Sequence, residues 1–224
     1  QNENKVTDIS NAIEKNGPIV AETKEPEPEI AEISFEELIV VDNDECAITI
    51  TEIDPDNLWG YTVKVKLENR SADKTYMFSV QSASVNGVQS DPLFATEVAP
   101  GKKSNNDINF LDDTLKDIGI QEITDIEITF KVYDSNDWTA DAVALETVHI
   151  YPIGEEKATV FKRESQPTDT VLFDDTNVSV IIIGYTDDPI WGYSVNLYLV
   201  NKTDIPLMYA VEEVSVNGYM ADPF

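Results

Sequence analysis

A long internal repeat limits what this chain can fold into more than any other feature. Residues 59–67 (WGYTVKVKL) return as residues 191–199 (WGYSVNLYL), at an offset of 132 (191 minus 59). Residues 84–87 (SVNG) return as 215–218, at an offset of 131 (215 minus 84), so one residue is lost between the two matches. With 224 residues, the chain is long enough for two domains. We therefore expect two copies of one fold.

The repeat divides the chain into three parts. Residues 1–37 form an acidic tail with a Glu/Pro run at 24–29, typical of an extended spacer, and one short helix is conceivable at 8–15. Residues 38–153 form the first repeat, residues 153–156 (IGEE) a linker, and residues 158–224 the second repeat.

We expect the second repeat to be incomplete, because Phe224 aligns near Leu93 and nothing matches residues 95–151. Half a sandwich would leave edge strands and one core face open to water. Three explanations stay open: the natural chain continues, the chain has been shortened, or another chain supplies the remaining strands.

Strand patterns fill both repeats. Apolar and polar residues alternate at 46–51, 61–68 and 126–133, which gives each segment an inward and an outward face. Asn86-Gly87 and Asn217-Gly218 are strong signals for tight hairpins. The one helical turn that we expect in the first repeat covers residues 112–118. Many short strands with almost no helix predict an all-β fold of tandem antiparallel sandwiches, and the immunoglobulin-like class fits the length best.

The composition excludes several classes of partner. Forty-three acidic and 15 basic residues give a net charge of −28, which repels nucleic acid and anionic membrane surfaces and favours cations and basic partners. The sequence has no apolar run long enough for a transmembrane segment. The single cysteine, Cys46, rules out an intramolecular disulfide and a cysteine-rich metal site.

Three segments resemble a recurring bacterial module: 54–61 (DPDNLWGY), 84–87 (SVNG) and 134–141 (DSNDWTAD). The module is similar to uncharacterised tandem repeats of predicted extracytoplasmic, lipoprotein-like proteins from Gram-positive gut bacteria. The resemblance covers about 38–151 and 171–224. It implies tandem Ig-like sandwiches at the cell surface, secreted or anchored after removal of a signal, with the acidic tail as a tether. It implies no catalytic residues.

The repeated aromatic residues allow two interpretations. Exposed tryptophans could stack on sugar rings, as in carbohydrate-binding modules. Alternatively, a tryptophan at the start of a central strand is an anchor in the core or at its rim. Because both copies need a core, we favour the anchor. The candidate ligand-binding residues are Trp59, Tyr61, Trp138, Trp191 and Tyr193.

The loop at 134–141 is a candidate for binding Ca²⁺, which prefers carboxylate and amide oxygens. Its oxygen ligands would be Asp134, Asn136, Asp137 and Asp141. The spacing does not follow the EF-hand pattern, so turn residues bonded to their own backbone are the favoured interpretation. A calcium-dependent adhesion domain remains one alternative function.

Catalytic motifs are lacking in the sequence. Cys46 aligns with Val178 and is expected to be a small buried apolar residue. His149 is the only histidine and lies in a predicted strand with no nucleophile motif. We therefore expect a non-enzymatic structural or adhesive module without a cofactor, whose protein or glycan partner the sequence does not identify.

The two repeats differ most on the outward face of the paired strands. Polar residues of the first repeat, among them Thr49, Lys66 and Glu68, are replaced by apolar ones in the second. If the two strands are neighbours, they form an apolar patch, which usually indicates an interface. We expect the first domain, the N-terminal segment or a second molecule to cover it, self-association included. The patch consists of Ile181, Ile183, Tyr198 and Val200.

Overall fold

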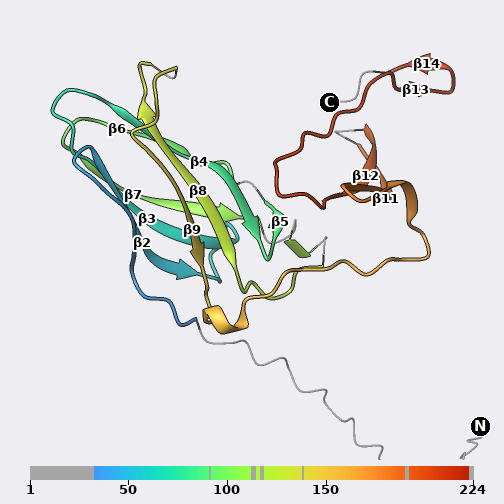
Figure 1. The fold of residues 1–224 in the computed structure, drawn as a ribbon, viewed down its shortest axis with the longest axis horizontal. Coiled ribbons are helices and arrows are strands. Elements are labelled where there is room, and N and C mark those ends of the chain that lie inside the picture. The colour runs from blue at the N-terminus through green and yellow to red at the C-terminus, as the bar shows by residue number, and fades with distance from the viewer. Residues whose placement is uncertain are drawn as a thin grey trace, which may run out of the picture. The chain divides into compact units, whose positions relative to one another are not determined.

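The computed structural model describes residues 33–90, 92–111, 115–116, 119–137, 139–189 and 192–221 (Figure 1). The helix expected at 8–15, with most of the acidic tail, lies outside these residues. Within them, antiparallel strands dominate and the 3-10 turn η1 (Glu155–Lys157) is the one complete helical element. The all-β, antiparallel prediction is confirmed. No helix in the described part is long and apolar enough to cross a membrane.

The chain divides into two compact units. The first holds the described residues up to Leu111 together with Glu122–Thr159, and the second holds those of 112–121 and of 160–221. Of the helical turn expected at 112–118, the structure describes Leu115 and Lys116, and both have a helical conformation. The strands of the first unit are β1 (Leu38–Asp42), β2 (Cys46–Asp54), β3 (Tyr61–Asn69), β4 (Tyr76–Val85), β5 (Val88–Gln89), β6 (Ala95–Val98), β7 (Lys103–Phe110), β8 (Ile126–Asp134) and β9 (Ala144–Ile150).

These strands form two sheets that lie in layers (Figure 1). One sheet has the order β1-β2-β3-β7. In the other, β8 lies between β4 and β9, and β5 and β6 pair with β4 on its other edge. Alternating burial along β3 and β8 turns one face of each sheet inward. The two inner faces supply fully buried side chains such as Ile48, Ile50, Leu67, Ile108, Phe78, Ile128 and Phe130.

The second unit contains the strands β10 (Thr170–Asp174), β11 (Val178–Asp188) and β12 (Gly192–Asn201), which form one sheet in that order. A separate hairpin joins β13 (Ser215–Val216) to β14 (Tyr219–Met220). Asn217 and Gly218 at its turn have φ values of 52° and 83°. Asn86 and Gly87 have φ values of 48° and 77° in the hairpin between β4 and β5. Both hairpins expected from Asn-Gly are therefore present, with the positive φ values that this turn requires.

The strands β10–β12 repeat the geometry of β1–β3 residue by residue. Leu38 pairs with Ile50 in the first unit, and their counterparts Thr170 and Ile182 pair in the second. Each sheet has two irregularities in register, and they fall at equivalent positions, for example after Ile50 and after Ile182. Such irregularities set which side chains face which way. The internal repeat in the sequence thus corresponds to three paired strands that occur twice, with β7 as a fourth strand of the sheet in the first unit.

Candidate interaction surface

The inner face of the β10–β12 sheet is a core face that is open to solvent. In the first unit, the inward residues of β3 are at most 8 % exposed: Tyr61, Val63, Val65 and Leu67. Their counterparts on β12 are between 37 and 70 % exposed: Leu197, Leu199, Val195 and Tyr193. On β11, the counterparts of the fully buried Cys46, Ile48 and Ile50 are only half-buried: Val178, Val180 and Ile182. Identical positions therefore face a packed core in one unit and water in the other.

The cover that this face lacks is visible in the first unit. There β4 lies between β8 and β6, and Phe78 on β4 and Phe130 on β8 are fully buried. The counterpart of β4 forms strand only at β13. Met208 and Val211 lie before β13 and are 94 and 61 % exposed. A strand needs partners to satisfy its backbone groups, so the β4 counterpart stays irregular where no described strand pairs with it.

Tyr193 and Tyr185 lie together near one end of the open face. Their rings stack with centroids 5.9 Å apart and an angle of 20° between the ring planes. Tyr185 is 59 % exposed and Tyr193 is 70 % exposed, so the pair presents aromatic surface to solvent. Sequence reasoning did not identify this pair, because Tyr185 has Ile53 as its counterpart and belongs to no repeated aromatic motif. Exposed aromatic and aliphatic side chains on one sheet face favour association with another apolar surface.

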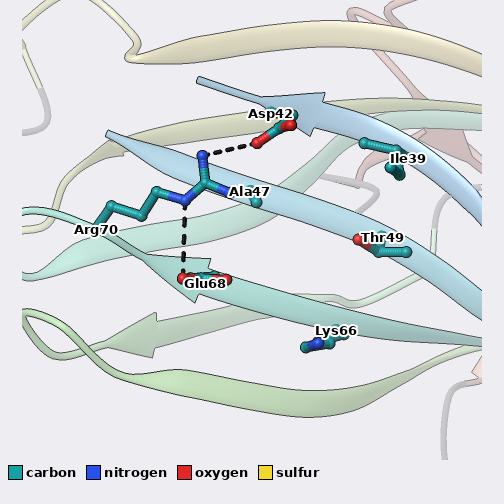
Figure 2. Close-up of a pocket in the computed structure, with 7 residues that line it drawn as sticks. All are labelled: Ile39, Asp42, Ala47, Thr49, Lys66, Glu68 and Arg70. Carbon is teal, nitrogen blue, oxygen red and sulfur yellow. Dashed lines mark ion pairs between the residues drawn. The ribbon is translucent and has the colours of Figure 1, made fainter. Parts of the chain in front are cut away.

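In the first unit, a shallow pocket lies on the outer face of β1–β3, which points away from the core (Figure 2). Arg70 is its central cation, with Nη1 2.7 Å from Asp42 Oδ1 and Nε 3.8 Å from Glu68 Oε1. Lys103 Nζ lies 3.0 Å from Glu68 Oε2, and this hydrogen bond lowers the pKa of Glu68. The lining carries two carboxylates, Asp42 and Glu68, and two cations, Lys66 and Arg70, so its formal charges cancel. The other lining residues are Ile39, Ala47 and Thr49.

The outer patch predicted on the second unit lies on β11 and β12, at positions that correspond to those of the pocket on β2 and β3. Its two strands are neighbours, as the prediction assumed, and Ile181 pairs directly with Tyr198. The Arg163 guanidinium lies 5.7 Å from the centre of the Tyr198 ring and forms two hydrogen bonds with Asp169, of 2.7 and 2.8 Å. The segment that leads into β10 therefore covers part of the patch. All four patch residues are half-buried: Ile181, Ile183, Tyr198 and Val200.

The aromatic candidates of the first repeat separate into two environments. Tyr61 lies in the core, and burial raises the pKa of its phenol. Trp59 lies on the turn before β3 and is 69 % exposed, which makes it a residue of the rim rather than of the core. The Asn57 side chain accepts a 3.0 Å hydrogen bond from the Trp59 backbone N–H, so the turn is held by its own residues. Trp138 and Trp191 lie outside the described residues.

In the acidic loop after β8, Asp134 and Asp137 form local hydrogen bonds. Asp134 accepts a bond from the Asn136 N–H, and Asp137 accepts bonds from both the N–H and the hydroxyl of Thr139. The Thr139 hydroxyl is the main cause of a lowered pKa at Asp137. Asp141 belongs to the same loop. No group of three or more His, Cys, Asp or Glu in the described chain is arranged to hold a metal ion. The calcium site stays a prediction.

Cys46 and His149 have different surroundings. Cys46 is fully buried, as expected, and burial raises the pKa of its thiol to about 11. His149 lies on the surface, with Nδ1 2.9 Å from Asp125 Oδ1 and Nε2 3.2 Å from Glu127 Oε2. Its ring stacks on Tyr151 at 5.8 Å. This acidic pair around His149 was not predicted, since neither acid belongs to a recognisable motif.

Comparisons of the chain with protein-family models, with curated proteins and with solved structures give no match. The proposals below therefore rest on the residues and the geometry described above, together with the sequence resemblance.

Proposed function

We propose that this protein is a non-enzymatic structural or adhesive interaction module, in which the open inner face of β10–β12 takes up an extended polypeptide segment. One observation carries the proposal: Tyr193, Val195, Leu197 and Leu199 are exposed at positions that are core positions in the first unit. Full burial of one such side chain contributes about 1.5–3 kcal/mol. A partner that covers several of them gains a substantial part of its binding free energy from this face.

The proposal includes the chemistry of the partner. In the first unit, this face is covered by a layer of extended chain whose apolar residues alternate with polar ones, as along β8. The open face of the second unit has the same spacing of apolar residues. We infer that the segment that covers this face is extended and alternating in the same way, whether it belongs to this chain or to another.

The fold class that we propose is Ig-like, and the strand order supports it. When β1 is set aside as an additional strand, one sheet has the order β2-β3-β7 and the other has β6-β4-β8-β9. These orders correspond to A-B-E and to C′-C-F-G of an immunoglobulin-type sandwich. The tandem arrangement is supported by the identical registers of β1–β3 and β10–β12. The extracytoplasmic location rests on the resemblance of the sequence motifs alone.

A screen of the whole chain against a random-peptide display library and a glycan array tests this proposal. We expect peptides with apolar residues at alternate positions to be enriched. Leu197→Lys should abolish their binding, because it places a charge on the open face. Asn196→Lys is the matched control on the opposite face of the same strand and should leave binding unchanged. Failure to recover any peptide that depends on Leu197 would overturn the proposal.

Trp59 favours a second candidate function, carbohydrate binding. Its indole is 69 % exposed on a turn that is fixed by Asn57, which suits stacking on a sugar ring. In this case the glycan array gives the positive result. Trp59→Ala should then abolish glycan binding without lowering the stability of the first unit, because the side chain contributes little to the core.

A further inference from the structure

The chain enters and leaves the first unit at the same end of the sandwich (Figure 1). The Ser34 N–H, just before β1, donates a 2.8 Å hydrogen bond to the carbonyl oxygen of Pro152, just after β9. At the other end of both strands, the Asn43 side chain donates a 3.2 Å hydrogen bond to the Val143 carbonyl oxygen. The two strands therefore run in opposite directions, and tension between residues 33 and 153 pulls on both at the same end.

We propose that β1 is a strap that tension releases, separating from β2 before the rest of the first unit opens. Its use rests on the structural or adhesive role proposed above, because such a module carries load along its chain. Pulling at Leu38 lifts β1 away from β2 from one end, so the hydrogen bonds between the antiparallel strands take the load one after another. Bonds that break in succession yield at a lower force than bonds that are loaded together.

The two strands that receive the load are held differently at the pulled end. Ile150 at the end of β9 and Ile153 beyond it are 1 and 7 % exposed, and β9 pairs with β8 in unbroken register. At the start of β1, Leu38 is half-buried and Ile39 is 62 % exposed. The register of β1 with β2 is also irregular between Ile39 and Val41. Because less apolar surface and a less regular ladder hold β1, it yields before β9.

Separation of β1 stops at the turn that joins it to β2. Arg70 Nη1 lies 2.7 Å from Asp42 Oδ1 and also donates to the Asn43 carbonyl oxygen. The Asn43 side-chain oxygen accepts a 2.8 Å hydrogen bond from the Cys46 N–H. Once β1 is free, the load enters near Cys46, at the opposite end of the sandwich from Ile150. The β2–β3 and β8–β9 ladders are then pulled along their strands, so their hydrogen bonds share the load.

The strap lengthens the chain while the sandwich stays folded. Extension of residues 34–42 adds about 3 nm, and transfer of the load to the far end of β9 adds about 2 nm, which gives a step of about 5 nm. Opening of the rest of the first unit, up to residue 152, adds roughly 35 nm. The two events therefore differ clearly in length.

Stretching the whole chain in an optical trap, held by its two ends, tests the inference. We expect a step of about 5 nm at a lower force than the step of roughly 35 nm. The short step should reverse when the tension is lowered, because β2 stays paired with β3 and offers the same edge again. A first unit that opens in one step, with no short step before it, overturns the inference.

A disulfide between β1 and β2 assigns the short step. Ile39 and Thr49 are paired and line the same outer face, so Ile39→Cys combined with Thr49→Cys joins the two strands. Mass spectrometry of the folded chain checks that this bond has formed. The short step should then disappear and return in a reducing agent, whereas steps from the second unit should not change. A short step that persists with the bond intact contradicts the assignment to β1.

A second pair of variants tests the strap without a disulfide. Val41 is 4 % exposed, so Val41→Ala removes packed atoms from β1 and should lower the force of the short step. Ile39→Ala is the matched control on the exposed face and should leave that force nearly unchanged. Equal effects of the two substitutions would count against β1 as the strand that separates.

The outcomes separate this inference from the proposed function. If library peptides bind through Leu197 and the short step is absent, only the strap inference fails. If the short step is present and responds to the disulfide, but no peptide binds, the strap stands and the proposed role of the β10–β12 face fails.

Discussion

Leu67 and Leu199 occupy the same position in two copies of one strand, so they allow a direct measurement of what burial contributes. Leu67 is fully buried between two sheets, whereas Leu199 is 40 % exposed. We expect Leu67→Ala to lower the free energy of unfolding of the first unit by about 2–5 kcal/mol, since it removes packed atoms and leaves a cavity. Leu199→Ala should cost at most about 1 kcal/mol. Urea denaturation of both variants measures the difference, and equal losses would contradict an open face.

Cys46 should be chemically inert in the folded protein. The side chain is fully buried, and burial raises the pKa of the thiol to about 11, so almost no thiolate exists at neutral pH. We expect an alkylating reagent to modify Cys46 only after denaturant unfolds the first unit. Mass spectrometry of samples labelled with and without denaturant checks this expectation. Rapid labelling of the native chain would show that the first unit opens readily.

At the scale of an element, an ion pair between Arg163 and Asp169 joins two parts of the segment that leads into β10. Asp169 accepts hydrogen bonds from Nη1 and Nη2 of Arg163 and from the Gln166 N–H. The hydrogen bonds from Arg163 are the main reason why the pKa of Asp169 lies below its ordinary value of 3.8. The folded pKa is thus lower than the unfolded pKa. The stabilising effect is fully present above about pH 4 and is lost as the pH falls through the folded pKa.

Acid titration of the second unit checks this sign. We expect its melting temperature to be constant from neutral pH to about pH 5 and to fall below about pH 4. Asp169→Asn should lower the melting temperature at neutral pH and weaken the fall in acid. Asp174, whose pKa is lowered by Lys202 and Ser179, contributes in the same direction, so the fall should shrink rather than vanish. A melting temperature that rises on acidification would contradict the assignment.

The strands were predictable from sequence to the extent that alternation and turn chemistry determine them. The alternating segments at 61–68 and 126–133 fall in β3 and β8, and the Asn-Gly pairs gave both hairpins, because few other residues adopt φ values above zero. The conformation of the β4 counterpart was less predictable. Met208 and Val211 match β4 residues, yet they lie outside any strand, since a strand depends on partners that its own sequence does not supply.

For the candidate surface, the sequence indicated that the strands of the second copy alone would leave one core face uncovered, and it left open what supplies the missing strands. It did not predict that Arg163 would cover Tyr198 on the opposite face, because Arg163 lies in a part of the second repeat that has no matching sequence in the first. Trp59 shows a similar limit. The repeat favoured an anchor in the core or at its rim, and the choice between them depends on where the turn before β3 points.

At the scale of the whole molecule, the two units should differ strongly in stability. The buried apolar side chains of the described strands come from β1–β9, and β10–β14 contribute none. Amides of β2, β3, β4 and β8 should therefore exchange with solvent only on global unfolding of the first unit. Those of β10–β12 should exchange at least roughly a hundredfold faster. Mass-spectrometric hydrogen exchange measures both sets in one sample. Equal protection would show that something covers the second sheet in solution.

The twin hairpins also affect how the protein ages. An asparagine followed by glycine can lose ammonia when the glycine nitrogen attacks the side-chain amide carbon, and hydrolysis of the resulting ring leaves an acid. Asn86 resists this attack, because its amide oxygen accepts bonds from the Thr124 and Asp125 N–H groups and its amide nitrogen donates to Glu122. Asn217 is exposed. During storage, deamidation should begin at Asn217, as a mass increase of one dalton in that tryptic fragment, while Asn86 stays intact.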